Sequence, residues 1–163
     1  MVALDVDGVL SDGGISIDNS GIESKRFYVR DGLGIRLLLD SGIKVGLITA
    51  RKSKVVEKRA KELSLTFVHQ GVKDKWGCLQ SEMEQAKLKS TECAFMGDDL
   101  IDLAILTKVG LATSPVDAAP EVINHVDWVS QKPGGSGAVR ELAEEILKAQ
   151  NMWDGIINRL INR

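Results

Sequence analysis

The stretch Val2-Ala3-Leu4-Asp5-Val6-Asp7-Gly8-Val9-Leu10 decides the fold of this chain. The apolar run Val2–Val6 predicts a short buried strand. It carries two aspartates, Asp5 and Asp7, whose side chains point the same way if the backbone stays extended. Two like charges that close resist ionisation unless a cation or a hydrogen-bond donor lies nearby. The stretch therefore predicts a strand that brings a paired acidic site to the edge of a sheet.

Short apolar runs alternate with longer helical patterns along the rest of the chain. Further strands are expected at Val45–Thr49, Thr66–His69, Cys93–Met96, Val109–Ala112 and Trp128–Val129. Helices are expected at Gly32–Asp40 with Asp31 as its N-cap, Ser53–Ser64, Lys73–Leu88, Leu100–Lys108, Ala118–Ile123 and Ala138–Gln150. This alternation predicts an α/β fold, a Rossmann-like parallel sheet with helices on both faces.

Two segments fall outside this alternation. Ile15–Ile17 and Glu23–Val29, joined by Asp18-Asn19-Ser20-Gly21, predict a β-hairpin insertion over residues 14–29. Residues 150–163 form a C-terminal tail with an apolar stripe at helical spacing, which predicts docking either on its own domain or on a neighbouring copy. The length of 163 residues predicts one domain, residues 1–163.

Composition narrows the function classes. Lys and Arg total 21 and Asp and Glu total 23, a net charge of −2 that argues against a nucleic-acid partner. The sequence has no apolar run of the roughly 18 residues that a membrane span needs, and no signal peptide, so we expect a cytoplasmic protein. Cys78 and Cys93 are expected to be reduced thiols. The first strand begins almost at residue 1, which predicts that a few upstream residues are missing.

Polar residues follow the first four expected strands, at the edge where ligands of such sheets bind. They lie in Asp5–Gly8, Thr49-Ala50-Arg51, Lys73-Asp74-Lys75 and Gly97-Asp98-Asp99-Leu100-Ile101-Asp102. Carboxylates suit Mg²⁺, while a lysine, a hydroxyl and backbone N–H groups suit phosphate oxygens. An aspartate can also accept a phosphoryl group as a nucleophile. The set predicts a site for phosphoryl transfer.

These motifs resemble those of the haloacid dehalogenase superfamily of phosphatases, whose nucleophile motif D-x-D-G-x-[TV] is matched by Asp5–Val9. A narrower resemblance, to 3-deoxy-D-manno-octulosonate 8-phosphate phosphatases, rests on Val29–Gly32, Gly71–Lys75, Gly97–Asp102 and Gly134–Glu141. It implies a small hairpin in place of a cap domain, and a homotetramer in which the hairpin closes a neighbour's site. Ala50 departs from this pattern, because the family commonly has Gly there.

The resemblance also implies roles for individual residues. Asp5 is expected to be the nucleophile and Asp7 the general acid and base. Mg²⁺ is expected to be held by Asp5, the backbone carbonyl of Asp7 and Asp98, with Asp99 and Asp102 holding bound waters or Lys75. The phosphoryl oxygens are expected to contact Thr49, Lys75 and the backbone N–H groups of Gly8 and Ala50. The resemblance implies that Arg30, Asp31 and Gly32 lie near the sugar, either within one chain or across a subunit boundary. Arg51 is expected to bind the carboxylate of the sugar acid, because a guanidinium binds a carboxylate through two hydrogen bonds, with a solvated helix start as the alternative.

The sequence leaves two interpretations for each of two features near the C-terminus. The loop Gly134–Gly137 is expected to be flexible and near the mouth of the site, with a plain turn as the alternative. Arg140 is expected either to pair within the last helix or to contact substrate.

The function implied is hydrolysis of a sugar-acid phosphate with Mg²⁺, in the synthesis of lipopolysaccharide precursors. One alternative substrate is a nine-carbon sugar-acid 9-phosphate, against which Arg51 weighs because relatives acting on it tend to have an acidic residue there. Two alternatives of another class are a phospho-accepting signalling domain and a silent regulatory domain. The acceptor Asp of a signalling domain follows its third strand, where this chain has His69-Gln70-Gly71, and the complete acid/base set weighs against a silent domain.

Overall fold

A six-stranded parallel sheet forms the centre of the computed structural model, which describes residues 1–162. Its strands lie in the order β5-β4-β1-β6-β7-β8, and every neighbouring pair is parallel. They are β1 Val2–Leu4, β4 Val45–Thr49, β5 Phe67–Gln70, β6 Ala94–Met96, β7 Leu111–Ser114 and β8 Trp128–Val129. The first strand lies inside the sheet because it is apolar on both faces, as parallel sheets require.

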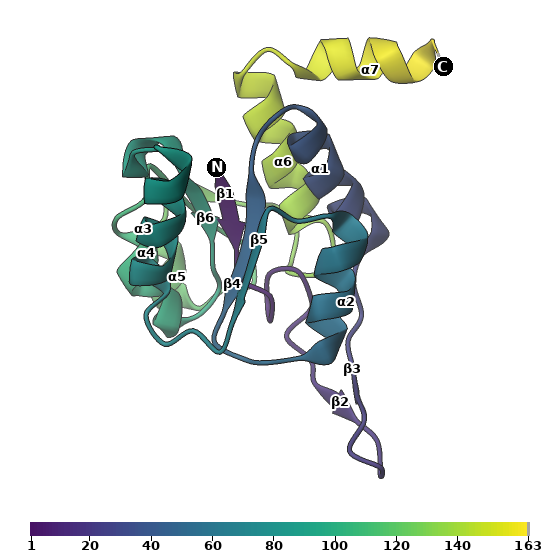
Figure 1. The fold of residues 1–163 in the computed structure, drawn as a ribbon, viewed down its shortest axis with the longest axis vertical. Coiled ribbons are helices and arrows are strands. Elements are labelled where there is room, and N and C mark those ends of the chain that lie inside the picture. Colours follow the sequence, from purple (N-terminus) through teal and green to yellow (C-terminus); the bar gives the residue numbers. More distant parts are fainter. Residues whose placement is uncertain (163) are drawn as a thin grey trace.

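Helices cover both faces of the sheet, which confirms the predicted α/β class. Figure 1 shows α1, α2 and α6 on one face and α3, α4 and α5 on the other. The helices are α1 Val29–Asp40, α2 Lys54–Leu63, α3 Lys75–Ala86, α4 Leu103–Leu106, α5 Pro120–Ile123, α6 Ala138–Ala149 and α7 Trp153–Ile161, with 3-10 turns η1 Ser90–Glu92 and η2 Leu100–Asp102. Side chains alternate between the two layers, so Val2 and Leu4 pack in one core and Ala3 in the other.

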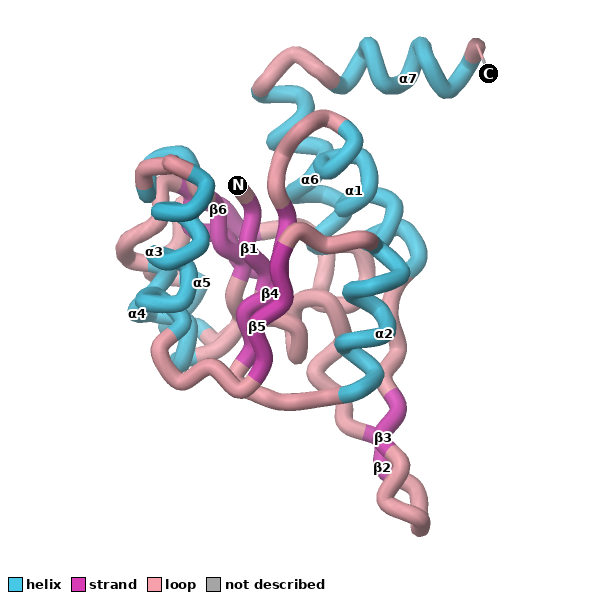
Figure 2. The backbone as a smooth tube through the Cα atoms, viewed as in Figure 1, coloured by secondary structure: helices cyan, strands magenta, loops and turns pink. Residues whose placement is uncertain are grey.

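The hairpin is present but shorter than predicted. Its strands are only β2 Ser16–Ile17 and β3 Glu23–Ser24, and Figures 1 and 2 show it extending away from the sheet. The chain then enters α1 at Val29, three residues before the predicted start, with Tyr28 as its N-cap. The prediction that Asp31 caps α1 was therefore wrong, because Asp31 lies inside the first turn and its carboxylate bonds to another segment.

The segment after β6 also differs from prediction. The single helix expected at Leu100–Lys108 is divided into η2 and the short helix α4. The division follows from Asp99 and Asp102, whose side chains bond to backbone N–H groups of this turn. The next strand, β7, lies two residues later than expected.

The C-terminal tail forms helix α7, which projects from the end of α6 (Figures 1 and 2). Ile156 is buried and Trp153 packs against the core on its own chain, while Ile161 is exposed. The first part of the tail, which includes Trp153 and Ile156, therefore packs on the core of its own chain. Residues 1–162 contain no helix with the length and apolar character of a membrane span.

Candidate active site

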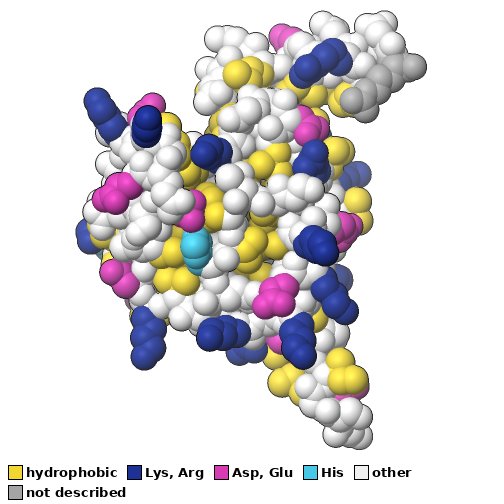
Figure 3. Space-filling model, viewed as in Figure 1, with side chains coloured by type: hydrophobic (Ala, Val, Ile, Leu, Met, Phe, Trp, Pro, Cys, Tyr) yellow, Lys and Arg dark blue, Asp and Glu magenta, His cyan; other side chains and the backbone are white. Residues whose placement is uncertain are grey.

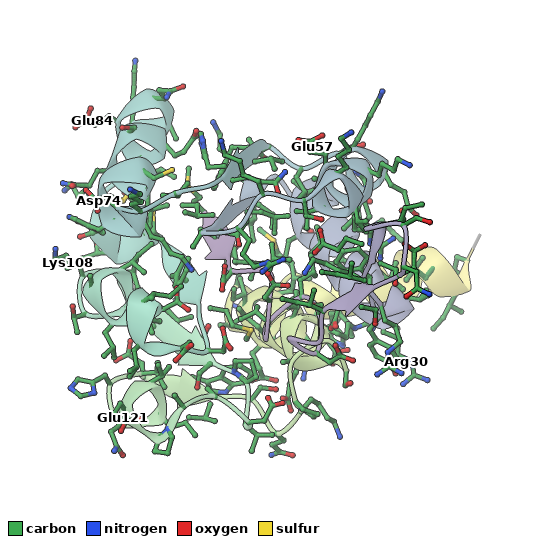
Figure 4. All side chains as sticks on the ribbon, turned by 90° about the horizontal axis from the view of Figure 1, so that it is seen from below. Arg30, Glu57, Asp74, Glu84, Lys108 and Glu121 are labelled. Carbon is green, nitrogen blue, oxygen red and sulfur yellow. The ribbon has the colours of Figure 1, made fainter. Side chains whose placement is uncertain are left out.

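Four predicted residues come together at the carboxyl ends of the central strands, the edge that faces the viewer in Figure 4. Asp5 follows β1 and Asp98 follows β6, and Lys75 is the first residue of α3. Carboxylate oxygens of Asp5, Asp98 and Asp102 lie within 4.8 Å of one another. Nζ of Lys75 lies 3.1 Å from Oδ1 of Asp5 and 2.5 Å from Oδ1 of Asp102. A buried acidic cluster with one ammonium group therefore lies at this edge.

Burial dominates the electrostatics of the cluster. Desolvation, partly offset by Lys75, raises the pKa of Asp5 to about 6. Desolvation and the neighbouring charge of Asp5 raise the pKa of Asp98 to about 7. Burial alone would lower the pKa of Lys75, but the charges of Asp5 and Asp102 raise it overall. A positive charge at the start of α3 is unfavourable against the helix dipole, and these carboxylates offset that cost.

The cluster fits a divalent cation. Oδ1 of Asp98 is buried and accepts no hydrogen bond from the described residues, and Oδ1 of Asp5 is buried with only its ion pair to Lys75 at 3.1 Å. Buried acceptors without partners are costly, and a hard cation such as Mg²⁺ would satisfy both. Both oxygens of Asp102 are already used, one by Lys75 and the other by the backbone N–H of Asp98 at 3.1 Å. Asp5 and Asp98 are thus the available side-chain ligands.

Gly8 allows the backbone to come close to this cluster. Its φ is +87°, and a Cβ at this position would lie 1.9 Å from Oδ2 of Asp98. Any other residue would be strained there and would displace the carboxylate. The close approach of the backbone to Asp98 therefore explains why the Asp-x-Asp motif is followed by a glycine.

Asp7 does not join the cluster through its side chain. The strand ends at Leu4, and the N–H groups of Val9, Leu10 and Ser11 turn back to bond the carbonyl of Val6. The prediction that Asp5 and Asp7 point the same way in extended backbone was therefore wrong. Of the three groups predicted to hold Mg²⁺, the acidic cluster contains the side chains of Asp5 and Asp98, with Asp102 beside them. The third group, the backbone carbonyl of Asp7, stays a prediction.

Lys25 of the hairpin is a candidate that the sequence reasoning missed. Its side chain is 0% exposed and pairs with Oδ1 of Asp7, while its Nζ lies 3.2 Å from Glu23. Arg51 completes the group, with Nε 3.5 Å from Oδ2 of Asp7 and a second nitrogen 3.5 Å from Glu23. No local spacing in the sequence marks Lys25, because its contact with Asp7 forms only when the chain returns from the hairpin past the loop that carries Asp7.

Thr49, Ala50 and Asp99 are the remaining predicted catalytic and supporting residues. Thr49 is buried at the end of β4 and accepts a hydrogen bond from the N–H of Arg51 at 3.4 Å, with Ala50 exposed between them. Asp99 is exposed and bonds to the N–H of Leu100, so only Asp102 of the two supporting aspartates contacts Lys75.

The predicted sugar-binding residues of α1 do not reach the cluster within one chain. Arg30 is exposed and lies at the periphery in Figure 4. Gly32 and Asp31 are buried, and the Asp31 carboxylate bonds to the backbone of Gly137 and Arg140.

Two features near the C-terminus are resolved by the structure. Residues 134–137 form a turn with Gly134, Gly135 and Gly137 buried, which is the alternative expected for this segment. The turn packs on the loop after β1, because the N–H of Gly135 donates to the carbonyl of Val9. Arg140 pairs with Glu144 at 2.5 Å within α6, one of its two expected placements.

A parallel sheet that presents an aspartate nucleophile motif, a lysine and a second acidic turn at one edge defines a hydrolase of the haloacid dehalogenase superfamily. No protein-family profile matches the chain. Similar individual proteins are nevertheless known. The 3-deoxy-D-manno-octulosonate 8-phosphate phosphatase KdsC of Escherichia coli K12 is 45% identical over 154 residues, which are 94% of this chain and 82% of that protein.

Two solved structures are similar throughout. The 3-deoxy-D-manno-octulosonate 8-phosphate phosphatase of Moraxella catarrhalis, solved with a magnesium ion, a phosphate ion and a KDO molecule, has a TM-score of 0.95 and 42% identity, covering 98% of this chain and 91% of that one. A Legionella pneumophila protein described as a HAD superfamily hydrolase, subfamily III A, has a TM-score of 0.94 and 41% identity, covering 99% and 89%. This chain belongs to the family of 3-deoxy-D-manno-octulosonate 8-phosphate phosphatases.

Proposed function

We propose that this protein is a Mg²⁺-dependent phosphatase that hydrolyses 3-deoxy-D-manno-octulosonate 8-phosphate to the free sugar acid and phosphate. The observation that carries the proposal is the buried cluster of Asp5, Asp98 and Asp102, in which Oδ1 of Asp98 has no hydrogen-bond partner and Oδ1 of Asp5 has only its ion pair with Lys75. The family's activity supports the same reading.

Asp5 is the proposed nucleophile. A carboxylate oxygen of Asp5 attacks phosphorus, and the bond from phosphorus to the sugar oxygen breaks as Asp7 gives that oxygen a proton. Asp7 then takes a proton from water, whose oxygen attacks the aspartyl-phosphate and releases phosphate and the Asp5 carboxylate. Lys25 and Arg51 contact Asp7 and thus hold this carboxyl away from the acidic cluster.

Mg²⁺ would be held by the carboxylates of Asp5 and Asp98 and the backbone carbonyl of Asp7. When bound, it supplies the positive charge that lets an anionic nucleophile approach an anionic phosphate. Asp102 holds Lys75 and the backbone of Asp98, and Asp99 is left for bound water.

Thr49 and Lys75 are the proposed partners of the phosphoryl oxygens, with the backbone N–H groups of Gly8 and Ala50 as further donors. Lys75 supports this role because its buried charge lies directly beside Asp5.

The sugar acid is proposed to bind at Arg51, whose guanidinium can take a carboxylate through two hydrogen bonds. Arg51 is exposed and lies beside Asp7, so a bound carboxylate would place the leaving oxygen near the proton donor. Arg30 is exposed and would contribute only across a boundary between subunits, whereas Asp31 and Gly32 are buried within the chain.

A homotetramer in the cytoplasm is the proposed assembly and location. The hairpin exposes Ile15, Ile17 and Ile22, which supports its contact with a neighbouring copy, and Figure 3 shows apolar atoms on the hairpin. The free thiols of Cys78 and Cys93 are typical of a reducing compartment. Light scattering after size exclusion tests the assembly, and a monomer at working concentration would contradict it.

The proposed activity is tested by phosphate release from a panel of sugar phosphates with Mg²⁺ and with EDTA. The panel includes the eight-carbon 8-phosphate and a nine-carbon sugar-acid 9-phosphate, and we expect a higher kcat/KM for the former. Asp5→Asn should lose activity by at least about 10³-fold with an unchanged circular dichroism spectrum. Asp40→Asn, at the exposed end of α1, is the matched control. A higher kcat/KM for the nine-carbon ester would identify that ester as the substrate instead. A long-lived phosphoenzyme would favour a signalling domain.

A further inference from the structure

Asp31 is a fully buried carboxylate that the proposed chemistry does not use. It lies in the first turn of α1 and is 0% exposed. Its Oδ1 accepts a hydrogen bond from the N–H of Arg140 at 2.8 Å, and its Oδ2 accepts one from the N–H of Gly137 at 3.3 Å. Gly137 is the N-cap of α6 and has no side chain to cap that helix. Asp31 therefore supplies the capping carboxylate from a different helix.

The loop that precedes α6 packs directly on the loop that carries the nucleophile. The N–H of Gly135 donates to the carbonyl of Val9 at 2.9 Å. A Cβ on Gly134 would lie only 1.8 Å from the carbonyl oxygen of Gly8, so the two backbones touch with no side chain between them. Gly8 in turn packs against the carboxylate of Asp98. A continuous set of contacts thus runs from Asp31 to the acidic cluster.

We propose that Asp31 is a positioning residue, which fixes the start of α6 and so holds loop 134–137, Gly8 and Val9 in the geometry that phosphoryl transfer needs. This inference rests on the proposed function and deepens it. It also replaces the sugar-binding role expected of Asp31, because a carboxylate with no exposed surface and two backbone partners has no oxygen free for a sugar hydroxyl.

The surroundings of Asp31 suit a carboxylate rather than an amide. Both oxygens face N–H donors, so the NH₂ group of an asparagine would face a donor in either orientation of its side chain. Burial raises the pKa of Asp31 to about 6, while the two N–H bonds and the charges of Arg140 and Arg59 oppose the rise. These arginines belong to α6 and α2, the two helices that pack beside α1 at this point.

The test compares Asp31→Asn with wild type on two esters, the sugar-acid 8-phosphate and p-nitrophenyl phosphate. We expect kcat to fall by about 10- to 100-fold, by the same factor for both esters, with KM changed less than about twofold. A sugar-binding role would instead raise KM for the sugar ester alone, and that result would overturn the inference. Unchanged kcat for both esters would also overturn it.

Asp127→Asn is the matched control, because Asp127 also accepts a backbone N–H, from Ala112 at 2.8 Å, but lies far along the sheet from Gly8. We expect Asp127→Asn to keep the wild-type kcat. An equal fall in kcat in this variant would overturn the inference, because it would show that both changes act through a general loss of stability.

A second variant guards against misfolding of Asp31→Asn. Asp117 is exposed and accepts the N–H of Gly134 at 2.9 Å, so Asp117→Ala loosens the same loop from its other side. We expect it to lower kcat for both esters in the same pattern, and an unchanged kcat would count against the loop's role.

Hydrogen exchange separates this inference from the proposed function. The amides of Gly135 and Gly137 should exchange at least about 10-fold faster in Asp31→Asn than in wild type, whether or not the protein hydrolyses the sugar ester. Unchanged exchange would overturn the inference. Wild type that releases phosphate from neither ester would overturn the proposed function instead.

Discussion

The affinity for Mg²⁺ should fall steeply as the pH is lowered from 8 to 6. The two proposed carboxylate ligands hold protons unusually well, because burial raises the pKa of Asp5 to about 6 and that of Asp98 to about 7. A divalent cation binds the ionised carboxylates, so it must displace whatever protons these groups carry. Lower pH therefore opposes binding even though ordinary aspartates would remain ionised throughout this range.

The size of the effect follows from these two values. At pH 6 about nine-tenths of Asp98 and about half of Asp5 would be protonated, whereas at pH 8 both would be almost fully ionised. Releasing these protons weakens the binding of Mg²⁺ by about 20-fold at pH 6, equivalent to about 1.8 kcal/mol. Binding should release about 1.4 protons at pH 6 and about 0.1 at pH 8.

Titration calorimetry measures both quantities, when the titration is repeated in two buffers of different ionisation enthalpy. Asp98→Asn should lose most of the affinity at both pH values, and Asp40→Asn is the control that should behave as wild type. Equal dissociation constants at pH 6 and pH 8, or no proton release at pH 6, would refute the placement of the cation between Asp5 and Asp98.

Three further changes test other parts of the site. Lys75→Met should lower kcat by about 10²- to 10³-fold and reduce the free energy of unfolding in urea by about 3 kcal/mol, because Asp5 and Asp102 lose their buried cation; full stability would contradict this pairing. Lys25→Met should lower kcat by about 10-fold and leave the Mg²⁺ dissociation constant unchanged, because Lys25 contacts Asp7 and not the cluster; Lys61→Met on exposed α2 is the control, and a changed Mg²⁺ affinity would argue against the assignment. In EDTA, Asp98→Asn should raise the free energy of unfolding above pH 7 and leave it unchanged below about pH 3.8, since a folded-state pKa of about 7 against an ordinary 3.8 destabilises the folded state as pH rises between them. The full difference between these pKa values corresponds to about 4 kcal/mol, and solvent screening of the partly buried carboxylate reduces the expected gain to about 2 kcal/mol; urea unfolding at both ends of this range checks the sign.

The order of strands and helices, and the edge at which the site lies, could be predicted from the sequence. Buried parallel strands are short apolar runs, and their carboxyl ends meet at one edge whatever the details of packing. Asp5, Thr49, Lys75 and Asp98 each end or follow such a run, so their convergence needed only the period of the pattern. The ends of elements were less accurate, because bonds such as those of Asp102 to neighbouring N–H groups replaced helix with a 3-10 turn.

Side-chain partners depended on contacts between distant segments and came only from the tertiary structure. The turn after Leu4 separates Asp5 from Asp7, and the hairpin then brings Lys25 to Asp7 from 18 residues away. Asp31 has the local pattern of an N-cap for α1, but its carboxylate caps α6, 106 residues further along. The sequence by itself determined which groups reach the edge of the sheet, since that follows from local periodicity. The tertiary structure decided which of them touch, since the donors and cations that a buried carboxylate needs come from other elements of the fold.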